Sequence, residues 1–375
     1  MMGKNVLGII FSNIHDEALN QLTDMRTMGS VPFCSRYRLI DFPLSNMVNS
    51  GITKVGIVTK ANYQSLMDHI GTGKPWDLSR KYEGMFLLPP FNIENGRAYQ
   101  SRVDAIQLNR QFIQQSQQEY VLMTDCNVVN SVDYNELFKF HADVDADISI
   151  IATRGKKPSN IDHILALDEV RKEDGRLISA SVDPECGDDE ILYSTNIMLI
   201  KKYVLDQVIT NAYSHNLHHF QRDVIMPNID KYKIHILEPN TYIATIDSLQ
   251  SYYDISMSML QSENRKRLFD REKPIYTKER DDMPARYGHT STAKNCLVAD
   301  GCVIEGDVEN SILFKGVTVG KGAVVKDCIL MQDTYIGENA KLNCVIADKN
   351  VTVKPYVELS GAKSYPVLLG KKTTV

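Results

Sequence analysis

Two short stretches near residue 330 decide the fold of the C-terminal part of the chain: VGKGAV at 319–324 and IGENAK at 336–341. Each fits the hexapeptide form of an aliphatic residue, a small residue, two free positions and a second small residue. Around them aliphatic residues recur six positions apart, with a one-residue slip after the fourth: Leu313, Val319, Val325, Met331, Ile336 and Leu342. Such repeats are typical of a parallel β-helix, in which each aliphatic side chain stacks inside a prism. We therefore expect a left-handed parallel β-helix over residues 291–375.

The repeat region itself indicates little chemistry. Some hexapeptide proteins are acyltransferases that use a catalytic histidine, but the last histidine of this chain is His289, before the repeats. The preceding segment, 262–290, is rich in charges, as in ENRKR at 263–267 and KERDD at 278–282. We interpret it as a solvated linker. A basic site for an effector anion is the alternative.

Short apolar runs alternate with helical patterns in residues 1–261. The apolar runs cover 6–11, 54–59, 120–123 and 147–152, and the helical patterns include 61–69 and 103–115. This alternation predicts an α/β domain with a mostly parallel, Rossmann-like sheet covered by helices on both faces. In such a domain the ligand crevice lies beyond the carboxyl ends of the strands.

Composition limits the classes of partner. The 375 residues are 43% hydrophobic and 24% charged, with a formal net charge of -5, which gives no electrostatic reason to expect nucleic-acid binding. No apolar run is long enough for a membrane span, and residues 6–11 read as a first strand rather than a signal peptide. We expect a cytoplasmic protein. The seven cysteines form no C-x-x-C pair and are expected to be small buried thiols, with a reactive thiol at Cys126 as the alternative.

Three stretches of the first domain resemble bacterial glucose-1-phosphate adenylyltransferase: SVPFCSRYRLIDFPLSNMVNSGI at 30–52, GTGKPWDL at 71–78 and, in its length and its ends, 120–134. The β-helix is that family's C-terminal domain, so the resemblance covers nearly the whole chain. The family joins glucose-1-phosphate and ATP to give ADP-glucose and pyrophosphate. The sugar phosphate is the nucleophile, so the protein mainly positions and neutralises charge. A glycine-rich loop approaches the phosphates, and two carboxylates hold Mg²⁺.

The family's phosphate loop is replaced in this chain. Its G-G-x-G-x-R pattern falls on residues 13–18, which contain no glycine. The arginine position is Ala18, and Asp16 and Glu17 add negative charge that should repel a triphosphate. A family lysine just beyond the loop falls at Met28.

The metal and sugar-phosphate positions are replaced as well. The two metal aspartates of the family fall at Asn127 and Thr245, or at Tyr242 in a different register for the second, and the lysine of its E-K-P motif falls at Asp183. We therefore expect no catalytic residue, no metal ligand and no cofactor in this chain. Asp125, two residues from the expected metal position, is the alternative as a displaced ligand.

Four residues that match the family segments are candidates for vestigial substrate binding: Arg36, Arg38, Trp76 and Asp77. For Arg36 and Arg38, ion pairing with Asp41 beneath the first crossover is the favoured interpretation. For Trp76 and Asp77 it is capping of the sheet or a subunit contact. A histidine-rich stretch, SHNLHHF at 214–220, is interpreted as a solvated helix face rather than a metal site.

The pattern resembles the non-catalytic D-type subunits of glycogen biosynthesis, which occur beside catalytic subunits. This resemblance implies a partner, a catalytic glucose-1-phosphate adenylyltransferase homologue in a hetero-tetramer that carries the Mg²⁺, together with a sugar-phosphate effector. It implies neither nucleic-acid nor membrane binding, and the β-helix should help to build the interface. An active adenylyltransferase with an atypical site and a stand-alone sensor of a sugar phosphate or nucleotide are the alternative functions.

Overall fold

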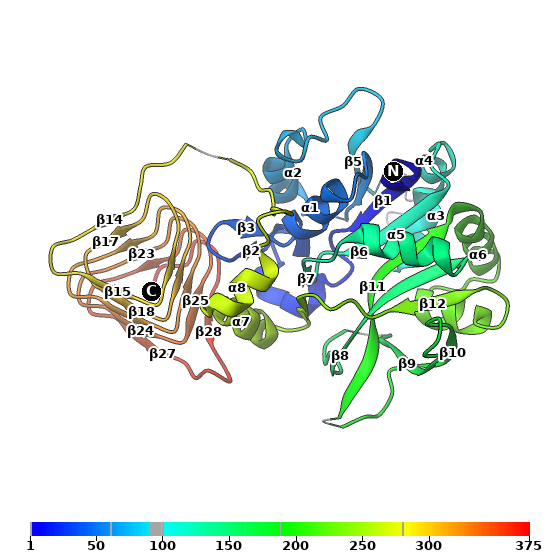
Figure 1. Ribbon diagram of the computed structural model, residues 1–375. Coiled ribbons are helices and arrows are strands. Elements are labelled where there is room, and N and C mark those ends of the chain that lie inside the picture. Colours follow the sequence, from blue (N-terminus) through cyan, green and yellow to red (C-terminus); the bar gives the residue numbers. More distant parts are fainter. Residues whose placement is uncertain are drawn as a thin grey trace.

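The computed structural model describes residues 2–60, 62–90, 99, 101–161, 163–187, 189–279 and 281–375. Figure 1 shows an N-terminal domain (blue to green) beside a β-helix (yellow to red), with helices α7 (Leu249–Ser258) and α8 (Ser262–Leu268) between them. Within the described ranges, no helix combines the length and apolar character that crossing a bilayer requires.

A nine-stranded sheet forms the centre of the N-terminal domain in the described part of the chain. Its strands are β1 (Val6–Phe11), β4 (Lys54–Val58), β5 (Gly84–Leu88), β6 (Tyr120–Asp125), β8 (Ile148–Lys156), β9 (Leu165–Val170), β10 (Leu177–Val182), β11 (Glu190–Lys201) and β12 (Ile234–Leu237). The order β5-β4-β1-β6 is parallel, as predicted, and β11 then runs antiparallel to β6 and β8.

Helices cover both faces of this sheet. The α-helices of the domain are α1 (Asp41–Asn49), α2 (Gln64–Ile70), α3 (Arg102–Leu108), α4 (Arg110–Gln114), α5 (Tyr134–Asp143) and α6 (Lys202–Ser214). Alternate residues of β1 enter different hydrophobic clusters, with Ile10 packing in the cluster that includes α1 and Ile9 in the cluster that includes α3 and α6. This period of two is what a strand buried on both faces requires.

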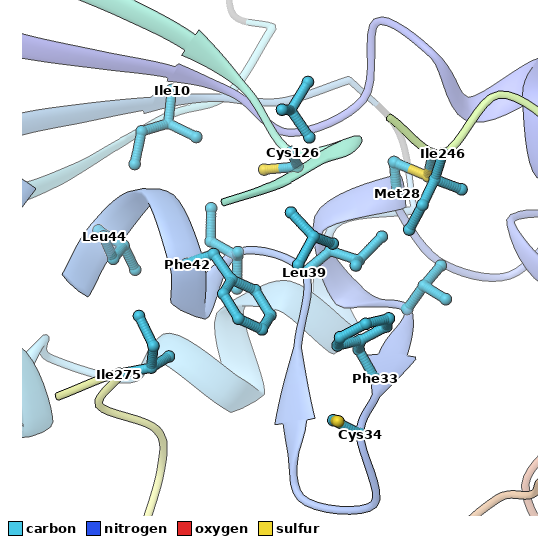
Figure 2. Close-up of a cluster of buried hydrophobic side chains, with 14 of the residues drawn as sticks. Ile10, Met28, Phe33, Cys34, Leu39, Phe42, Leu44, Cys126, Ile246 and Ile275 are labelled. Atoms are coloured by element: carbon cyan, nitrogen blue, oxygen red, sulfur yellow. The ribbon is translucent and has the colours of Figure 1, made fainter. Parts of the chain in front are cut away.

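Close packing explains details of the first cluster, part of which is shown in Figure 2. Gly8 of β1 faces Met47 of α1, and an added Cβ there would lie 2.5 Å from the Met47 sulfur.

Two helices differ in their bounds from the sequence prediction. The helix expected over 61–69 begins at Gln64, and Ala61 lies outside the described residues. The helix expected over 103–115 is divided into α3 and α4 at Asn109.

The C-terminal domain is the predicted β-helix, built from three five-stranded parallel sheets in the fully described stretch 281–375. The first sheet contains β14 (Arg286–Tyr287), β17 (Val303–Ile304), β20 (Thr318–Val319), β23 (Tyr335–Ile336) and β26 (Thr352–Val353). The second contains β15 (Thr292–Lys294), β18 (Asp307–Glu309), β21 (Val324–Lys326), β24 (Lys341–Asn343) and β27 (Glu358–Ser360). The third contains β16 (Leu297–Val298), β19 (Ile312–Leu313), β22 (Ile329–Leu330), β25 (Val345–Ala347) and β28 (Val367–Leu369).

One expected interior residue lies outside the prism. Leu313, Val319 and Val325 pack in the interior cluster, but the next interior position is Leu330 rather than Met331. The one-residue slip therefore occurs one step earlier than the sequence pattern suggested. Met331 belongs instead to the cluster of the N-terminal domain, because it follows β22 on the outer face of the third sheet.

The outer face of the third sheet is covered by the N-terminal domain. Ile312, Phe314, Ile329 and Ile346 pack there in one cluster with Tyr252 of α7. A hydrogen bond extends this contact, since the hydroxyl of Tyr253 on α7 donates to the carbonyl of Asp327 at 2.7 Å. The two domains therefore share one continuous core.

The segment 262–290 is structured at both ends. It begins as α8 and its last part contains β14. Arg265 donates to the carbonyls of Met259 and Leu260, both at 2.7 Å, so this cation closes the end of α7. Leu268 is buried against the N-terminal domain. Arg280, within the charged run 278–282, lies outside the described residues.

Candidate functional site

The candidate crevice lies where β1 and β6 end. These strands are parallel and in register, and their last residues, Phe11 and Asp125, are paired. The loop after β1 and the turn after β6 therefore meet at one edge of the sheet, where α/β domains bind ligands. The amide of Cys126 donates to the carbonyl of Phe11 at 3.3 Å, which joins the two segments.

The loop after β1 folds back on itself. It contains a 3₁₀-helix, η2 (Asp16–Leu22), in which Ala18 is buried. The amide of Met28 donates to Oδ1 of Asp16 at 2.7 Å, so the loop's own carboxylate satisfies a backbone donor. Burial raises the pKa of Asp16 to about 7, although the Met28 hydrogen bond and the charge of Lys60 oppose the rise.

Met28 is part of the hydrophobic core. Its side chain is 1% exposed and lies in the cluster that also contains Cys126 and Ile246, as Figure 2 shows. A lysine at this position would extend toward the crevice, whereas Met28 offers no charge to a phosphate. Burial likewise raises the pKa of the Cys126 thiol well above its ordinary value, so Cys126 is a packing residue and not a reactive thiolate.

Asp125 is the carboxylate nearest to the family's metal position, and it is already paired. Its Oδ2 accepts from Arg102 Nη2 at 2.6 Å and lies 2.9 Å from Nε2 of His15. The Arg102 guanidinium also lies over the ring of Phe11, 4.7 Å from its centre. Burial alone would raise the pKa of Asp125, but the charges and hydrogen bonds of Arg102 and His15 hold it below its ordinary value.

Asn127 and Thr245 are brought together. Thr245, the last residue of β13 (Ile243–Thr245), pairs with Val128, the first residue of β7 (Val128–Asn130). The amide of Ile246, the residue after Thr245, donates to the carbonyl of Asn127 at 2.8 Å. Tyr242, the alternative position, lies beside Ser131 at the other end of the pair. The structure thus places Thr245 at the site, and neither Asn127 nor Thr245 can supply a charged oxygen to a cation.

Asp183 stabilises the turn that follows β10 by accepting hydrogen bonds from backbone amides. Its two carboxylate oxygens accept from the amides of His163 and Ile164, both at 2.9 Å. The residue has a positive φ of 52° and follows β10, at the edge of the sheet. An aspartate tolerates this backbone conformation because its side chain bonds locally.

The residues retained from the family segments stabilise the scaffold. Trp76 is 1% exposed and donates from its indole to the Ser45 hydroxyl at 3.2 Å, so it cannot reach a ligand in the crevice. Arg38 donates to the Ser65 carbonyl at 2.6 Å. Within the described residues, the carboxylate of Asp41 accepts from the Arg38 amide at 3.0 Å and lies 2.6 Å from His69 Nε2, rather than forming the expected ion pair with an arginine side chain.

Two further candidates are exposed and lie away from the crevice. Arg36 is exposed in the turn between β2 (Pro32–Phe33) and β3 (Tyr37–Arg38). Asp77 follows Trp76, and its exposed carboxylate pairs with Arg80 three residues on.

The residues do not fit Mg²⁺. Among the described residues, no group of three or more histidine, cysteine, aspartate or glutamate side chains has the arrangement of a metal site. The histidine-rich stretch is spread out, with His218 beside Asp104 at 3.3 Å and the His219 ring against the His163 ring.

Sequence reasoning missed the residues that neutralise the crevice. Arg102 begins α3 and belongs to no motif, and His15 falls on a free position of the loop pattern at 13–18. The signal available was indirect: an aspartate at the end of a buried strand must have a cationic or hydrogen-bonding partner. The sequence does not indicate which of its basic residues that partner is.

Comparison with known proteins agrees with this geometry. Residues 17–161 match the family model described as Nucleotidyl transferase, and residues 283–362 match GlmU-like, C-terminal hexapeptide. The Glycogen biosynthesis protein GlgD of Bacillus subtilis (strain 168) is 34% identical over 99% of this chain and 97% of that protein. The protein of the same name from Geobacillus stearothermophilus is 35% identical over 99% and 98%. A Glucose-1-phosphate adenylyltransferase of Clostridium perfringens (strain SM101 / Type A) is 32% identical over 90% and 87%.

Proposed function

The chain belongs to the family of glucose-1-phosphate adenylyltransferases and GlgD-type glycogen biosynthesis proteins, and on that premise we propose that it is a non-catalytic subunit in glycogen biosynthesis. It assembles with a catalytic homologue, in a hetero-tetramer, and changes that homologue's activity. The catalytic partner supplies the Mg²⁺ and the ADP-glucose chemistry, and a sugar phosphate is the effector to which the pair responds.

One observation carries the proposal: the carboxylate that remains in the crevice is committed to protein partners. Asp125 is fully buried and is bonded to Arg102 and His15. Both partners bond the same oxygen, Oδ2, which could bind a metal only by leaving them, and a buried charge loses several kcal/mol when a partner is removed. Asn127 and Thr245 beside it are neutral. Catalytic groups of this kind act as a unit, so losses at several positions are not offset by one surviving carboxylate.

The loop adds a second argument against nucleotide chemistry. Asp16 and Glu17 stand where the family's glycine-rich loop approaches the phosphates. The Met28 amide donates to Asp16 instead of remaining available to an anion. A triphosphate would therefore meet side chains and negative charge where it needs open backbone amides.

A subunit without chemistry can still regulate. It needs only to bind one conformation of its partner more tightly than another, which shifts the partner's equilibrium. The third sheet of the β-helix is covered by its own N-terminal domain, so the outer faces of the other two sheets remain for the partner. Tyr335 of β23, 42% exposed, lies on one of these faces and is suited to an interface.

The decisive experiment measures ADP-glucose formation by this chain, by its catalytic homologue and by the pair. We expect background activity for the chain alone, co-elution of the two proteins, and altered kinetics or effector response for the pair. Removing the β-helix is a poor test, since it would expose Tyr252 and the other apolar side chains of the N-terminal domain that pack against Ile312 and Phe314. The Tyr335→Lys variant of the full chain is preferable, with Tyr213→Lys on α6, 60% exposed, as the matched control.

Two outcomes would favour the alternative functions. Mg²⁺-dependent ADP-glucose synthesis by the chain alone, abolished by Asp125→Ala, would make it an active enzyme with an atypical site. Absence of any complex, combined with binding of a sugar phosphate or nucleotide by the isolated chain, would make it a sensor.

A further inference from the structure

A pocket of about 540 Å³ lies where the two domains meet, outside the crevice residues described above. Three segments and Asn160 form its walls, the segments being η2 of the degenerate loop, the beginning of α7, and residues 364–368 of the β-helix. Its volume is within the range of pockets that hold small ligands. None of its lining residues is among the positions that match the family's catalytic motifs except Ala18.

One wall of the pocket is an insertion in the repeat. From β22 to β25, Ile329 pairs with Ile346, so one coil takes 17 residues. From β25 to β28, Val345 pairs with Val367, so the last coil takes 22 residues. The five additional residues form a loop at about 361–366 that reaches the N-terminal domain, where Gln250 Nε2 donates to the Lys363 carbonyl at 2.7 Å. In stacked repeats, insertions of this kind mark binding faces.

The lining of the pocket carries no charged side chain and combines apolar with polar residues. Among the lining residues are four amide side chains, with donors and acceptors for hydroxyl groups: Asn20, Gln21, Asn160 and Gln250. Tyr365 adds an aromatic ring that is 81% exposed, directly before the buried Pro366. The adjacent cavity of about 400 Å³ differs, because Asp24, Arg26, Asp348 and Lys371 line it.

The amide-bearing wall is held in place before any ligand arrives. Asn20 has a positive φ of 35°, and its carbonyl accepts from the amide and the hydroxyl of Thr23, at 2.8 and 2.7 Å. Gln250 is fixed by Asp254 as well as by Lys363. The backbone at Asn20 and the side chain of Gln250 are thus preorganised, which lowers the entropy cost of binding, and unusual backbone conformations such as that of Asn20 cluster at functional sites.

We propose that this pocket binds a neutral oligosaccharide. Its hydroxyl groups exchange hydrogen bonds with the amides, and a sugar ring packs its C–H face on the ring of Tyr365. The absence of charge in the lining argues against a phosphorylated ligand, which would gain nothing there. The choice of an α-linked glucan as the saccharide rests on the proposed function in glycogen biosynthesis. The inference that the pocket binds a saccharide of some kind rests on its lining alone.

Isothermal titration of the full chain tests this inference, with maltopentaose, cellopentaose and glucose-1-phosphate as probes at up to about 10 mM. We expect maltopentaose to bind and Tyr365→Ala to weaken its binding by about tenfold or more. The Tyr365→Phe variant keeps the ring and should bind nearly as the unmodified chain does. Tyr213→Ala, on α6 and 60% exposed, is the matched control and should change nothing.

Each other outcome has a definite meaning. Binding of cellopentaose instead of maltopentaose, with the same loss in Tyr365→Ala, supports the pocket and changes only the linkage. Binding of neither, or equal binding by Tyr365→Ala and the unmodified chain, overturns the inference. Assembly with the catalytic homologue is measured separately without sugar. If Tyr365→Ala abolishes that assembly and no sugar binds, the pocket is a protein interface, and the proposed function stands without this site.

Discussion

The domain interface and the crevice each contain a buried arginine paired with a buried aspartate. At the interface, Arg26 Nη2 donates to both oxygens of Asp348, at 2.7 and 2.6 Å, and both side chains are 2% exposed. In the crevice, Arg102 Nη2 donates to one oxygen of Asp125. The other oxygen of Asp125 and Nη1 of Arg102 have no hydrogen-bond partner within the described residues.

We interpret the Arg26–Asp348 pair as a structural contact and the Arg102–Asp125 pair as the remains of a site. Asp348 also accepts from the amide of Lys349 at 2.6 Å, so both of its oxygens are used by protein groups. The crevice instead retains buried polar atoms that have no partner among the residues the structure describes, including Nδ2 of Asn13 and Oδ1 of Asn127. Proteins leave polar groups unsatisfied mainly where function once required or still requires them. Substitutions in the two pairs test whether the pairs differ in this way.

The largest effect is expected at the interface. Arg26→Met leaves Asp348 buried without its cation, and breaking such a pair costs about 3–5 kcal/mol in the free energy of unfolding. Urea denaturation measures the loss. The double variant Arg26→Met/Asp348→Asn removes both charges and should recover part of it. If Arg26→Met alone costs under about 1 kcal/mol, this pair does not fasten the domains.

A smaller loss is expected in the crevice. Arg102→Met strands Asp125, but His15 remains 2.9 Å away and takes over part of the compensation, so we expect about 2–3 kcal/mol. Without Arg102, burial raises the pKa of the Asp125 carboxyl, which is then more readily protonated in acid, so the deficit should be smaller at pH 5 than at pH 8. An equal deficit at both pH values would contradict the assignment of Asp125 as a charged, paired group.

Asp16 should make the loop sensitive to pH. Its folded-state pKa of about 7 lies above the ordinary value of 3.8, so the folded state holds this proton more tightly than the unfolded state. Stability from this group is present below about pH 4 and is lost as the pH rises toward 7. Asp16→Asn keeps an oxygen for the Met28 amide and cannot ionise.

The variant should therefore gain stability relative to the unmodified chain between pH 5 and pH 8, by about 1–2 kcal/mol. Thermal unfolding of both proteins across this range measures the difference. Glu17→Gln, at the exposed neighbouring position, is the matched control and should show no such trend. A gain at pH 5 that equals the gain at pH 8 would show that Asp16 does not titrate in this window.

The same contrast explains what the sequence could predict. The β-helix and the parallel part of the sheet follow from periods of six and two residues, which the chain displays locally. Met331 was misplaced because a slip of one residue moves a side chain from the interior to the outer face. Arg26 and Asp348 are 322 positions apart, and Arg102 and Asp125 are 23 apart, so neither pair leaves a periodic signal.

The sequence could predict that the candidate site lacks the family's metal and phosphate residues. It could not predict how the remaining side chains are arranged. Asn127 and Thr245 could be aligned with family motifs, and the structure places them side by side across β7 and β13. Trp76, in contrast, reads the same in sequence whether it lines a crevice or fills a core. Only its burial and its hydrogen bond to Ser45 distinguish the two.

The smallest effect is expected from restoring a carboxylate at the metal position. Asn127→Asp returns one negative group, but Thr245 beside it stays neutral and Asp125 stays bonded to Arg102 and His15. The loop still places Asp16 against the Met28 amide, so no backbone donors are released for a phosphate. Because these groups contribute to catalysis together, repairing one should leave ADP-glucose formation by the isolated chain at background.

A matched Asn130→Asp variant, at the other end of β7, separates the effect of position from that of charge. Clear Mg²⁺-dependent synthesis by Asn127→Asp and not by Asn130→Asp would mean that the crevice is one residue from activity, and that its unsatisfied polar atoms belong to a working site.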